Sequence, residues 1–159
     1  VVARSLEAVG IDRVLTMDLH AGQIQGFFTG PVDHMTAQPM LTQWFADQYD
    51  PAELVVVSPD AGRAKAARNF ARKIGTGWAI MEKERPEQQV AEIGYVVGDV
   101  KDKIAIISDD MIDTAGTLCA AARTVLDEGA KSVIACAQSE PTSSSDSTPN
   151  PFSIWPAAF

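Results

Sequence analysis

The stretch that decides the fold reads Ile104-Ala105-Ile106-Ile107-Ser108-Asp109-Asp110-Met111-Ile112-Asp113-Thr114-Ala115-Gly116-Thr117. Its four leading apolar residues, three of them β-branched, predict a buried strand. Two carboxylates follow at the end of this strand, and a turn of small and hydroxyl-bearing residues comes next. After the turn, apolar residues at helical spacing predict a helix that ends at Gly129: Leu118, Ala121, Ala122, Val125 and Leu126. Strand, polar turn and helix in this order form the place where open α/β sheets bind ligands.

The turn over 113–117 has the chemistry of an anion site. Backbone N–H groups at a helix N-terminus, with the hydroxyls of Thr114 and Thr117, favour an anion and most simply a phosphate. Asp109 and Asp110 would repel a phosphate but accept hydrogen bonds from sugar hydroxyls. A ligand with a phosphate at one end and a diol at the other suits both parts. The ordinary alternative is a strand–turn–helix in which Asp and Thr side chains only cap the helix.

Composition limits the class of protein. The chain has 159 residues, 46% of them apolar, which suits one α/β domain with a real core. A net charge of −8 argues against nucleic acid or an anionic membrane as partner. We expect no membrane span, because no apolar run is long enough, and no signal sequence at the start. Cys119 and Cys136 lack metal-type spacing and favour a reducing, cytoplasmic setting.

Strand and helix patterns alternate along the chain, which predicts an α/β fold with a mostly parallel sheet and helices on both faces. Residues 1–12 are predicted as the remnant of a preceding helix, 13–137 as the domain, and 138–159 as a Ser/Thr/Pro-rich tail expected to be disordered. The predicted strands are 13–17, 54–57, 78–81, 93–97, 104–107 and 132–137. The predicted helices are 35–48, the segment from 63 to 73, and 118–126, with a long connection over 18–33 and a charged loop over 82–89.

The segment around the opening stretch resembles the ribose-5-phosphate loop of type I phosphoribosyltransferases and of ribose-phosphate diphosphokinases (PRPP synthetases). Many members carry glycine where Ala115 stands, and a small residue should still fit. The resemblance implies a type I phosphoribosyltransferase-like fold. It also implies that Asp113, Thr114, Ala115, Gly116 and Thr117 bind the 5-phosphate.

The segment 18–33, Asp-Leu-His-Ala-Gly-Gln-Ile-Gln-Gly-Phe-Phe-Thr-Gly-Pro-Val-Asp, follows a predicted strand. Asp18, His20 and Asp33 offer oxygen and imidazole ligands for a divalent ion, which we expect to be Mg²⁺ held largely through water. Taken alone, an Asp-x-His at a strand end is more often structural. The whole segment, however, resembles the signature stretch of PRPP synthetases, which the transferases lack. The chain is therefore identified as a member of that family, with the resemblance covering residues 1 to about 137.

A third carboxylate, Asp60, stands in Val57-Ser58-Pro59-Asp60-Ala61-Gly62, where a predicted strand meets a helix. The ordinary alternative is that Asp60 caps the helix. In the resembling family the matching aspartate binds the metal. Many members have a second glycine where this chain has Arg63.

A charged segment, Glu82-Lys83-Glu84-Arg85-Pro86, follows the next strand. Such a segment is usually solvated surface. In the resembling family the matching lysine and arginine lie in a mobile catalytic loop, which makes Lys83 and Arg85 the catalytic candidates. Their charge suits the task, because phosphoryl transfer needs little covalent help but much neutralisation.

The resemblance implies transfer of the diphosphoryl group of MgATP to ribose 5-phosphate, giving PRPP and AMP. Asp109 would bind the ribose diol, Asp110 beside it would help to hold the metal and the sugar, and Arg85 would also contact the sugar phosphate. His20 and Asp60, with Asp18 and Asp33 nearby, would hold Mg²⁺. The family is usually a cytoplasmic homo-oligomer, often hexameric, and no nucleic acid or membrane partner is expected.

Two departures from the family leave alternatives open. Members have a further domain before the point where this chain begins, and further sheet elements where the tail stands. The chain is therefore expected to be partial and inactive alone. A PRPP-consuming phosphoribosyltransferase is one alternative, against which 18–33 argues. A catalytically silent regulatory subunit is another, favoured by the missing half and disfavoured by intact Lys83, Arg85, His20 and Asp60.

Overall fold

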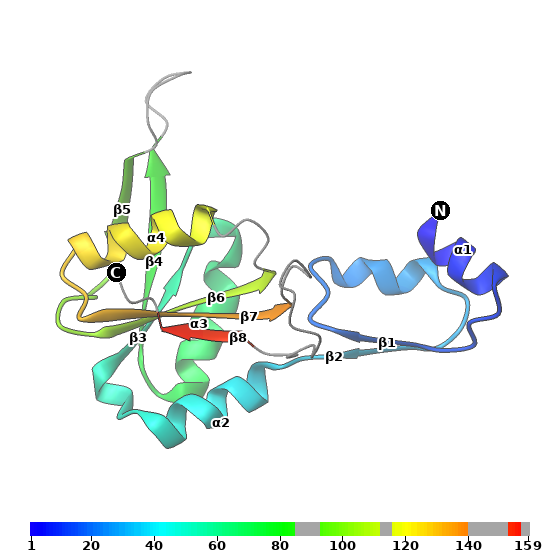
Figure 1. Ribbon diagram of the computed structural model, residues 1–159, viewed down its shortest axis with the longest axis horizontal. Helices are drawn as coiled ribbons and strands as arrows, with labels where there is room; N and C mark the ends of the chain where they lie inside the picture. Colours follow the sequence, from blue (N-terminus) through cyan, green and yellow to red (C-terminus); the bar gives the residue numbers. More distant parts are fainter. Residues whose placement is uncertain (85–92, 112–115, 140–152, 157–159) are drawn as a thin grey trace, which may run out of the picture. The chain divides into compact units, whose positions relative to one another are not determined.

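The computed structural model describes residues 1–84, 93–111, 116–139 and 153–156 (Figure 1). By compactness the chain divides into two units, Val1–Pro39 and Met40–Phe159. This division differs from the predicted boundary near residue 12, because Glu7 of the first helix accepts hydrogen bonds from Thr29 on the far side of that boundary. Among the described residues, none of the helices combines the length and the apolar character needed to cross a bilayer.

The first unit contains helix α1 (Val2–Ala8), strand β1 (Val14–Met17), the 3₁₀ helix η1 (Gly22–Phe27) and strand β2 (Val32–Met35). Strands β1 and β2 pair in parallel, with Val14 opposite Val32. Strand β2 replaces the end of the predicted connection and the start of the predicted helix. The helix itself, α2, runs over Gln38–Gln48 and has Pro39 in its first turn, where proline costs no hydrogen bond.

The second unit is built on a six-stranded sheet in the order β5-β4-β3-β6-β7-β8. Its strands are β3 (Leu54–Ser58), β4 (Gly77–Glu84), β5 (Ile93–Val97), β6 (Ile104–Met111), β7 (Ser132–Ser139) and β8 (Ser153–Pro156). Strand β3 is parallel to β4 and β6, and β6 is parallel to β7. Strands β5 and β8 run antiparallel at the two edges. The predicted mostly parallel sheet is therefore confirmed.

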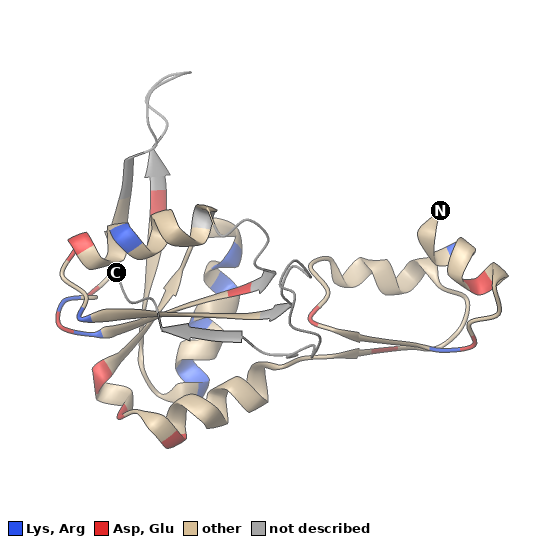
Figure 2. Ribbon diagram, viewed as in Figure 1, with Lys and Arg blue, Asp and Glu red and all other residues tan. Residues whose placement is uncertain are grey.

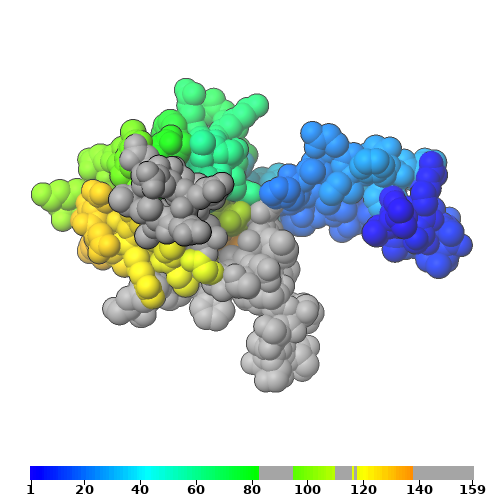
Figure 3. All heavy atoms as spheres, turned by 90° about the horizontal axis from the view of Figure 1, so that it is seen from above, coloured from blue at the N-terminus to red at the C-terminus, as the bar shows by residue number. Residues whose placement is uncertain are grey.

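Helices α3 (Ala64–Ile74) and α4 (Gly116–Asp127) cover opposite faces of this sheet. Lys and Arg residues lie along the exposed side of α3 (Figure 2). In the view from above, α3 in teal and green and α4 in yellow lie on opposite sides (Figure 3). Two shorter 3₁₀ helices, η2 (Pro51–Glu53) and η3 (Ala61–Arg63), precede β3 and α3. Helices on both faces were predicted, and the structure confirms them.

Each face of the sheet has its own buried layer. On the α4 side the buried cluster takes alternate strand residues together with the helix: Val55, Val57, Ala79, Met81, Val100, Ala105, Ile107, Ala121, Ala122, Val125, Ala130 and Val133. The intervening residues Val56 and Ile106 are fully buried and point to the other face, since side chains alternate along a strand. There Phe70 of α3 meets Phe45 of α2 with ring centroids 6.0 Å apart. A sheet buried on both faces explains why its central strands are continuous apolar runs.

The prediction of a disordered tail over 138–159 is wrong for residues 138–139 and 153–156, which lie in strands. Strand β7 continues to Ser139, and Ser153–Pro156 forms β8 beside it, with Ala135 opposite Trp155. The edge of β7 offers backbone N–H and C=O groups that a short segment of high strand propensity can pair with. Residues 140–152 and 157–159 of the predicted tail lie outside the described residues.

Candidate active site

The carboxyl ends of β3 and β6 form the candidate site. The two strands are parallel neighbours, with Val57 opposite Ile107, so Ser58 and Ser108 follow at the same edge of the sheet. Strand β6 continues beyond its predicted end through both aspartates, and Asp109 stays paired with Ala137 of β7. Pairing with β7 therefore fixes the backbone of Asp109 at this edge of the sheet. Of Asp110 the structure describes the backbone only.

The turn after β3 is held by its own side chains. Ser58 is fully buried, and its hydroxyl donates a hydrogen bond to the carbonyl oxygen of Asp60 at 2.7 Å. Oδ1 of Asp60 accepts a hydrogen bond from the backbone N–H of Arg63 at 2.9 Å. A Cβ at Gly62 would lie 3.1 Å from the same Oδ1 atom, so glycine suits this tight turn. Asp60 thus caps η3, the ordinary alternative considered for it, and stands at the edge where a ligand would bind.

Arg63 joins the two strand ends. Its Nη1 atom lies 3.2 Å from Oδ1 of Asp109, and the two side chains are 26% and 30% exposed. From the sequence, Arg63 was a departure from the glycine common in the resembling family, and its contact with Asp109 was not predicted. The pair spans the β3–β6 neighbourhood, which no local pattern in the sequence reveals.

The phosphate-binding turn is described only at its end. Gly116 is exposed and begins α4, as the predicted helix N-terminus requires. Asp113, Thr114 and Ala115 lie outside the described residues, and of Thr117 only the backbone is described. Their role in binding a phosphate stays a prediction.

Behind the edge, Cys136 of β7 pairs with Ser108 of β6. Burial raises the pKa of the Cys136 thiol to about 11, although a hydrogen bond with Ser108 acts in the opposite direction. A thiol with so high a pKa is not a nucleophile at neutral pH. The site's chemistry therefore rests on its charged and hydroxyl groups.

The two catalytic candidates follow β4. The prediction that Glu82–Glu84 starts a loop is wrong. These residues extend β4 and pair with β5, with Lys83 opposite Gly94. Antiparallel pairing with Ile93–Val97 gives these charged residues a strand partner that the sequence pattern did not show. The structure describes the backbone of Lys83 only, and Arg85 lies outside the described residues.

The remaining metal candidates belong to the first unit. Asp18 has a φ of 44° and its Oδ2 atom accepts a hydrogen bond from the N–H of Ala37 at 2.7 Å. Asp33 is held by Arg13 through both carboxylate oxygens, at 2.5 and 3.0 Å. His20 is exposed. Among the residues that the structure describes, no three His, Cys, Asp or Glu side chains gather where they could hold a metal ion.

His34 of β2, for which the sequence pattern predicts no role, contacts two residues of the loop after β1. Nε2 of His34 accepts a hydrogen bond from the N–H of Leu19 at 3.0 Å, and Gln25 contacts its Nδ1 at 3.1 Å. His34 is exposed. Its contacts hold the loop that carries His20 next to β2.

Comparison with known proteins extends this geometry to a family. The family model "Phosphoribosyl transferase domain" matches residues 37–146. The chain belongs to the phosphoribosyl transferase domain family. The matched residues cover most of the second unit, which starts at Met40, and they include strands β3 to β7 with their carboxyl edge.

Curated relatives of this phosphoribosyl transferase domain are ribose-phosphate pyrophosphokinases. That of Clostridium perfringens is 53% identical over 137 residues, which are 85% of this chain and 43% of the relative. That of Aquifex aeolicus is 50% identical over 136 residues, 86% of this chain and 44% of the relative. The chain thus spans less than half the length of these relatives. The resemblance to PRPP synthetases is confirmed.

Solved structures agree. The phosphoribosylpyrophosphate synthetase of Mycobacterium smegmatis is 45% identical, with a TM-score of 0.77 over 87% of this chain and 45% of that chain. A purine phosphoribosyltransferase from Pyrococcus horikoshii, 19% identical with a TM-score of 0.55, covers 88% of this chain and 85% of that chain. At 19% identity the second match shows the fold alone. The predicted type I phosphoribosyltransferase-like fold is therefore confirmed.

Proposed function

We propose that this chain is the sugar-phosphate-binding part of a ribose-phosphate diphosphokinase. The whole protein would transfer the diphosphoryl group of ATP to the 1-hydroxyl of ribose 5-phosphate, giving PRPP and AMP. The observation that carries this proposal is the 53% identity over 137 residues to the ribose-phosphate pyrophosphokinase of Clostridium perfringens. The strand-end carboxylates of the second unit support it independently.

The sugar would bind at the carboxyl edge between β3 and β6. Asp109, a third exposed at this edge, would accept hydrogen bonds from the ribose diol, with Asp110 beside it. The exposed Gly116 begins α4, and the positive end of the helix dipole favours the 5-phosphate over residues 113–117. The diol and the phosphate of one ligand would thus meet two different parts of the same strand–turn–helix.

Charge neutralisation would come from the end of β4. Strand β4 is parallel to β3, so its carboxyl end reaches the same edge of the sheet as Asp60 and Asp109. Lys83 lies at this end, and Arg85 follows it. Fixed cations there would stabilise the negative charge that shifts between phosphate oxygens in the transition state.

Mg²⁺ is the proposed cofactor, and it would neutralise the ATP phosphates when bound. A site of one or two carboxylates completed by water and substrate phosphates is usual for this ion. Asp60 in the second unit is a proposed ligand, and His20 and Asp18 are the proposed ligands in the first unit. Asp33 fits less well, because it would have to leave Arg13 before it could bind a cation. We also propose a cytoplasmic homo-oligomer, hexameric as in the resembling family.

Calorimetry with ribose 5-phosphate tests the binding half of this proposal. The chain should bind the sugar phosphate, and Gly116→Val should abolish binding because a branched side chain crowds the turn. Gly77→Val is the matched control, since Gly77 starts β4 and nothing lies within 4 Å of a Cβ added there. Equal binding by both variants would contradict the assignment of the turn. The chain alone should not form PRPP at the typical enzyme rate of about 10 s⁻¹.

A further inference from the structure

The ion pair between Arg63 and Asp109 is a feature of the site that the proposed roles do not use. Both side chains are about a quarter to a third exposed, so the pair is neither a solvated surface contact nor a fully buried one. It links the turn after β3 with the strand end that carries the proposed sugar-binding carboxylate. Arg63 therefore contacts an oxygen of the carboxylate that we propose binds the ribose diol.

Arg63 is poorly suited to its place in the helix. It is the N-cap residue of α3, and its side chain makes no capping hydrogen bond. N-cap positions favour Ser, Thr, Asp and Asn, and the positive end of a helix dipole disfavours a cation. Helix stability thus does not explain an arginine here. Its contact with Asp109 does, because the carboxylate compensates the charge.

The site has an electrostatic difficulty that Arg63 resolves. Asp109 and Asp110 are adjacent carboxylates, and the proposed ligand is itself an anion. Repulsion between the Asp109 carboxylate and the anionic ligand would weaken binding, because like charges disfavour one another. A cation fixed 3.2 Å from Oδ1 of Asp109 offsets that repulsion and also limits how the carboxylate can rotate.

We propose that Arg63 is a positioning residue that orients Asp109 and, by its charge, admits an anionic sugar phosphate beside the acidic pair. This inference rests on the proposed function, because it takes ribose 5-phosphate as the ligand. It assigns Arg63 no contact with the reacting atoms. The charge is essential to the role, and the length of the side chain is secondary.

The test measures the Kd of ribose 5-phosphate by calorimetry for wild type, Arg63→Met and Arg63→Lys. Met keeps most of the apolar stem without the charge, and it should weaken binding by a factor on the order of 3 to 10. Lys keeps the charge and should restore most of the affinity, which a merely structural role of the stem would not produce. In an Asp109→Asn background, Arg63→Met should have little further effect, because the carboxylate that Arg63 compensates is gone.

Arg72→Ala is the matched control. Arg72 is exposed near the other end of α3, about 14 Å further along the helix axis. Its removal takes away one cation without touching the pair and should change the Kd by less than about twofold, as expected of a screened surface charge.

The outcomes are distinct. Tighter binding by Arg63→Met would overturn the inference, because Arg63 would then compete with the sugar for Asp109. Unchanged binding would also overturn it, while leaving the proposed function intact. If wild type itself does not bind ribose 5-phosphate, the proposed function fails first, and the role of Arg63 toward that ligand fails with it.

Discussion

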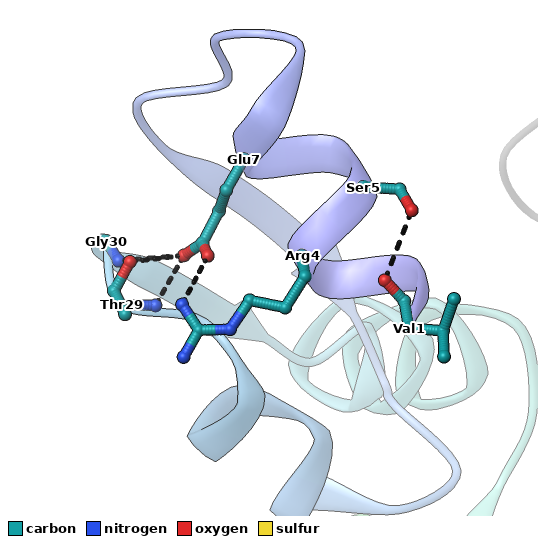
Figure 4. A network of polar contacts seen from close by, with 6 residues as sticks. All are labelled: Val1, Arg4, Ser5, Glu7, Thr29 and Gly30. Atoms are coloured by element: carbon teal, nitrogen blue, oxygen red, sulfur yellow. Dashed lines mark hydrogen bonds and ion pairs between the residues drawn. The ribbon is translucent and has the colours of Figure 1, made fainter.

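Glu7 fixes helix α1 to the loop before β2 in the first unit. Its Oε1 atom accepts hydrogen bonds from the backbone N–H and hydroxyl of Thr29, at 2.5 and 2.6 Å, and Arg4 contacts its Oε2 atom at 3.0 Å (Figure 4). These donors favour the charged carboxylate and lower the pKa of Glu7 from 4.5 to about 2. A single partly buried side chain thus joins two segments of the unit.

The pKa of Glu7 predicts a pH dependence for this attachment. Because the folded-state pKa is depressed, the contribution is present above the unfolded value of 4.5 and is lost as pH falls through about 2. The Thr29 amide resonance should therefore titrate well below pH 4.5 in an NMR series, and Glu7→Gln should abolish that titration. Glu128→Gln, at an exposed residue of the second unit, is the control. A Thr29 midpoint near 4.5 would contradict the contact.

At the scale of elements, the turn after β5 depends on Gly98. Its φ is +127°, and a Cβ there would lie 2.7 Å from Cβ of Ala79 and 2.9 Å from its Cα in β4. Both the backbone angle and the close approach exclude a side chain. The hairpin of β4 and β5, which carries Lys83, is therefore held in register by a glycine.

Replacing Gly98 should destabilise the second unit strongly. Gly98→Ala adds backbone strain of about 1 kcal/mol and an overlap with β4 that costs on the order of 1–3 kcal/mol more. Gly75→Ala is the matched control, since Gly75 has a φ of +88° with nothing within 4 Å of an added Cβ. The Gly75→Ala variant should lose only the stability that corresponds to the backbone strain. Urea unfolding of both variants measures the difference, and equal losses would contradict the close approach.

The elements predicted from sequence are those whose signal is local. The apolar runs at Leu54–Val57 and Ile104–Ile107 gave the central strands, because a sheet buried on both faces needs them. Strands β2, β8 and the end of β4 were missed, since each exists through pairing with a distant segment.

In the candidate site too, features with a local sequence signal were predicted and features that depend on distant segments were not. The position of Asp109 at a strand end and the capping geometry of Asp60 follow from short motifs. The contact of Arg63 with Asp109 requires β3 and β6 to be neighbours, a fact of sheet order that periodicity does not contain. Local patterns thus predict the positions of the carboxylates, whereas the contact of Arg63 with Asp109 is known only from the order of the strands.

At the scale of the whole molecule, the proposed binding of ribose 5-phosphate can be tested separately from the proposed transfer of the diphosphoryl group. The elements proposed to hold the sugar phosphate are all in the second unit. The chain covers 43% of the length of the Clostridium perfringens relative, so the rest of that relative lies outside the aligned part. Joining the chain to the remaining half of the Clostridium perfringens relative gives a protein in which transfer can be measured.

In that joined protein, Lys83→Ala should lower kcat by a factor on the order of 10²–10³, comparable to losing one preorganised donor. The reason is that a cation near the transferring group acts mainly when charge moves onto the bridging oxygens, so its contribution appears in the transition state. The Kd of ribose 5-phosphate should change little, because Asp109 and the turn before α4 hold that ligand. Glu84→Ala, the next residue of β4 with the opposite charge, is the matched control and should be mild. Steady-state kinetics decide the matter: a raised KM with unchanged kcat would mean that Lys83 only binds substrate.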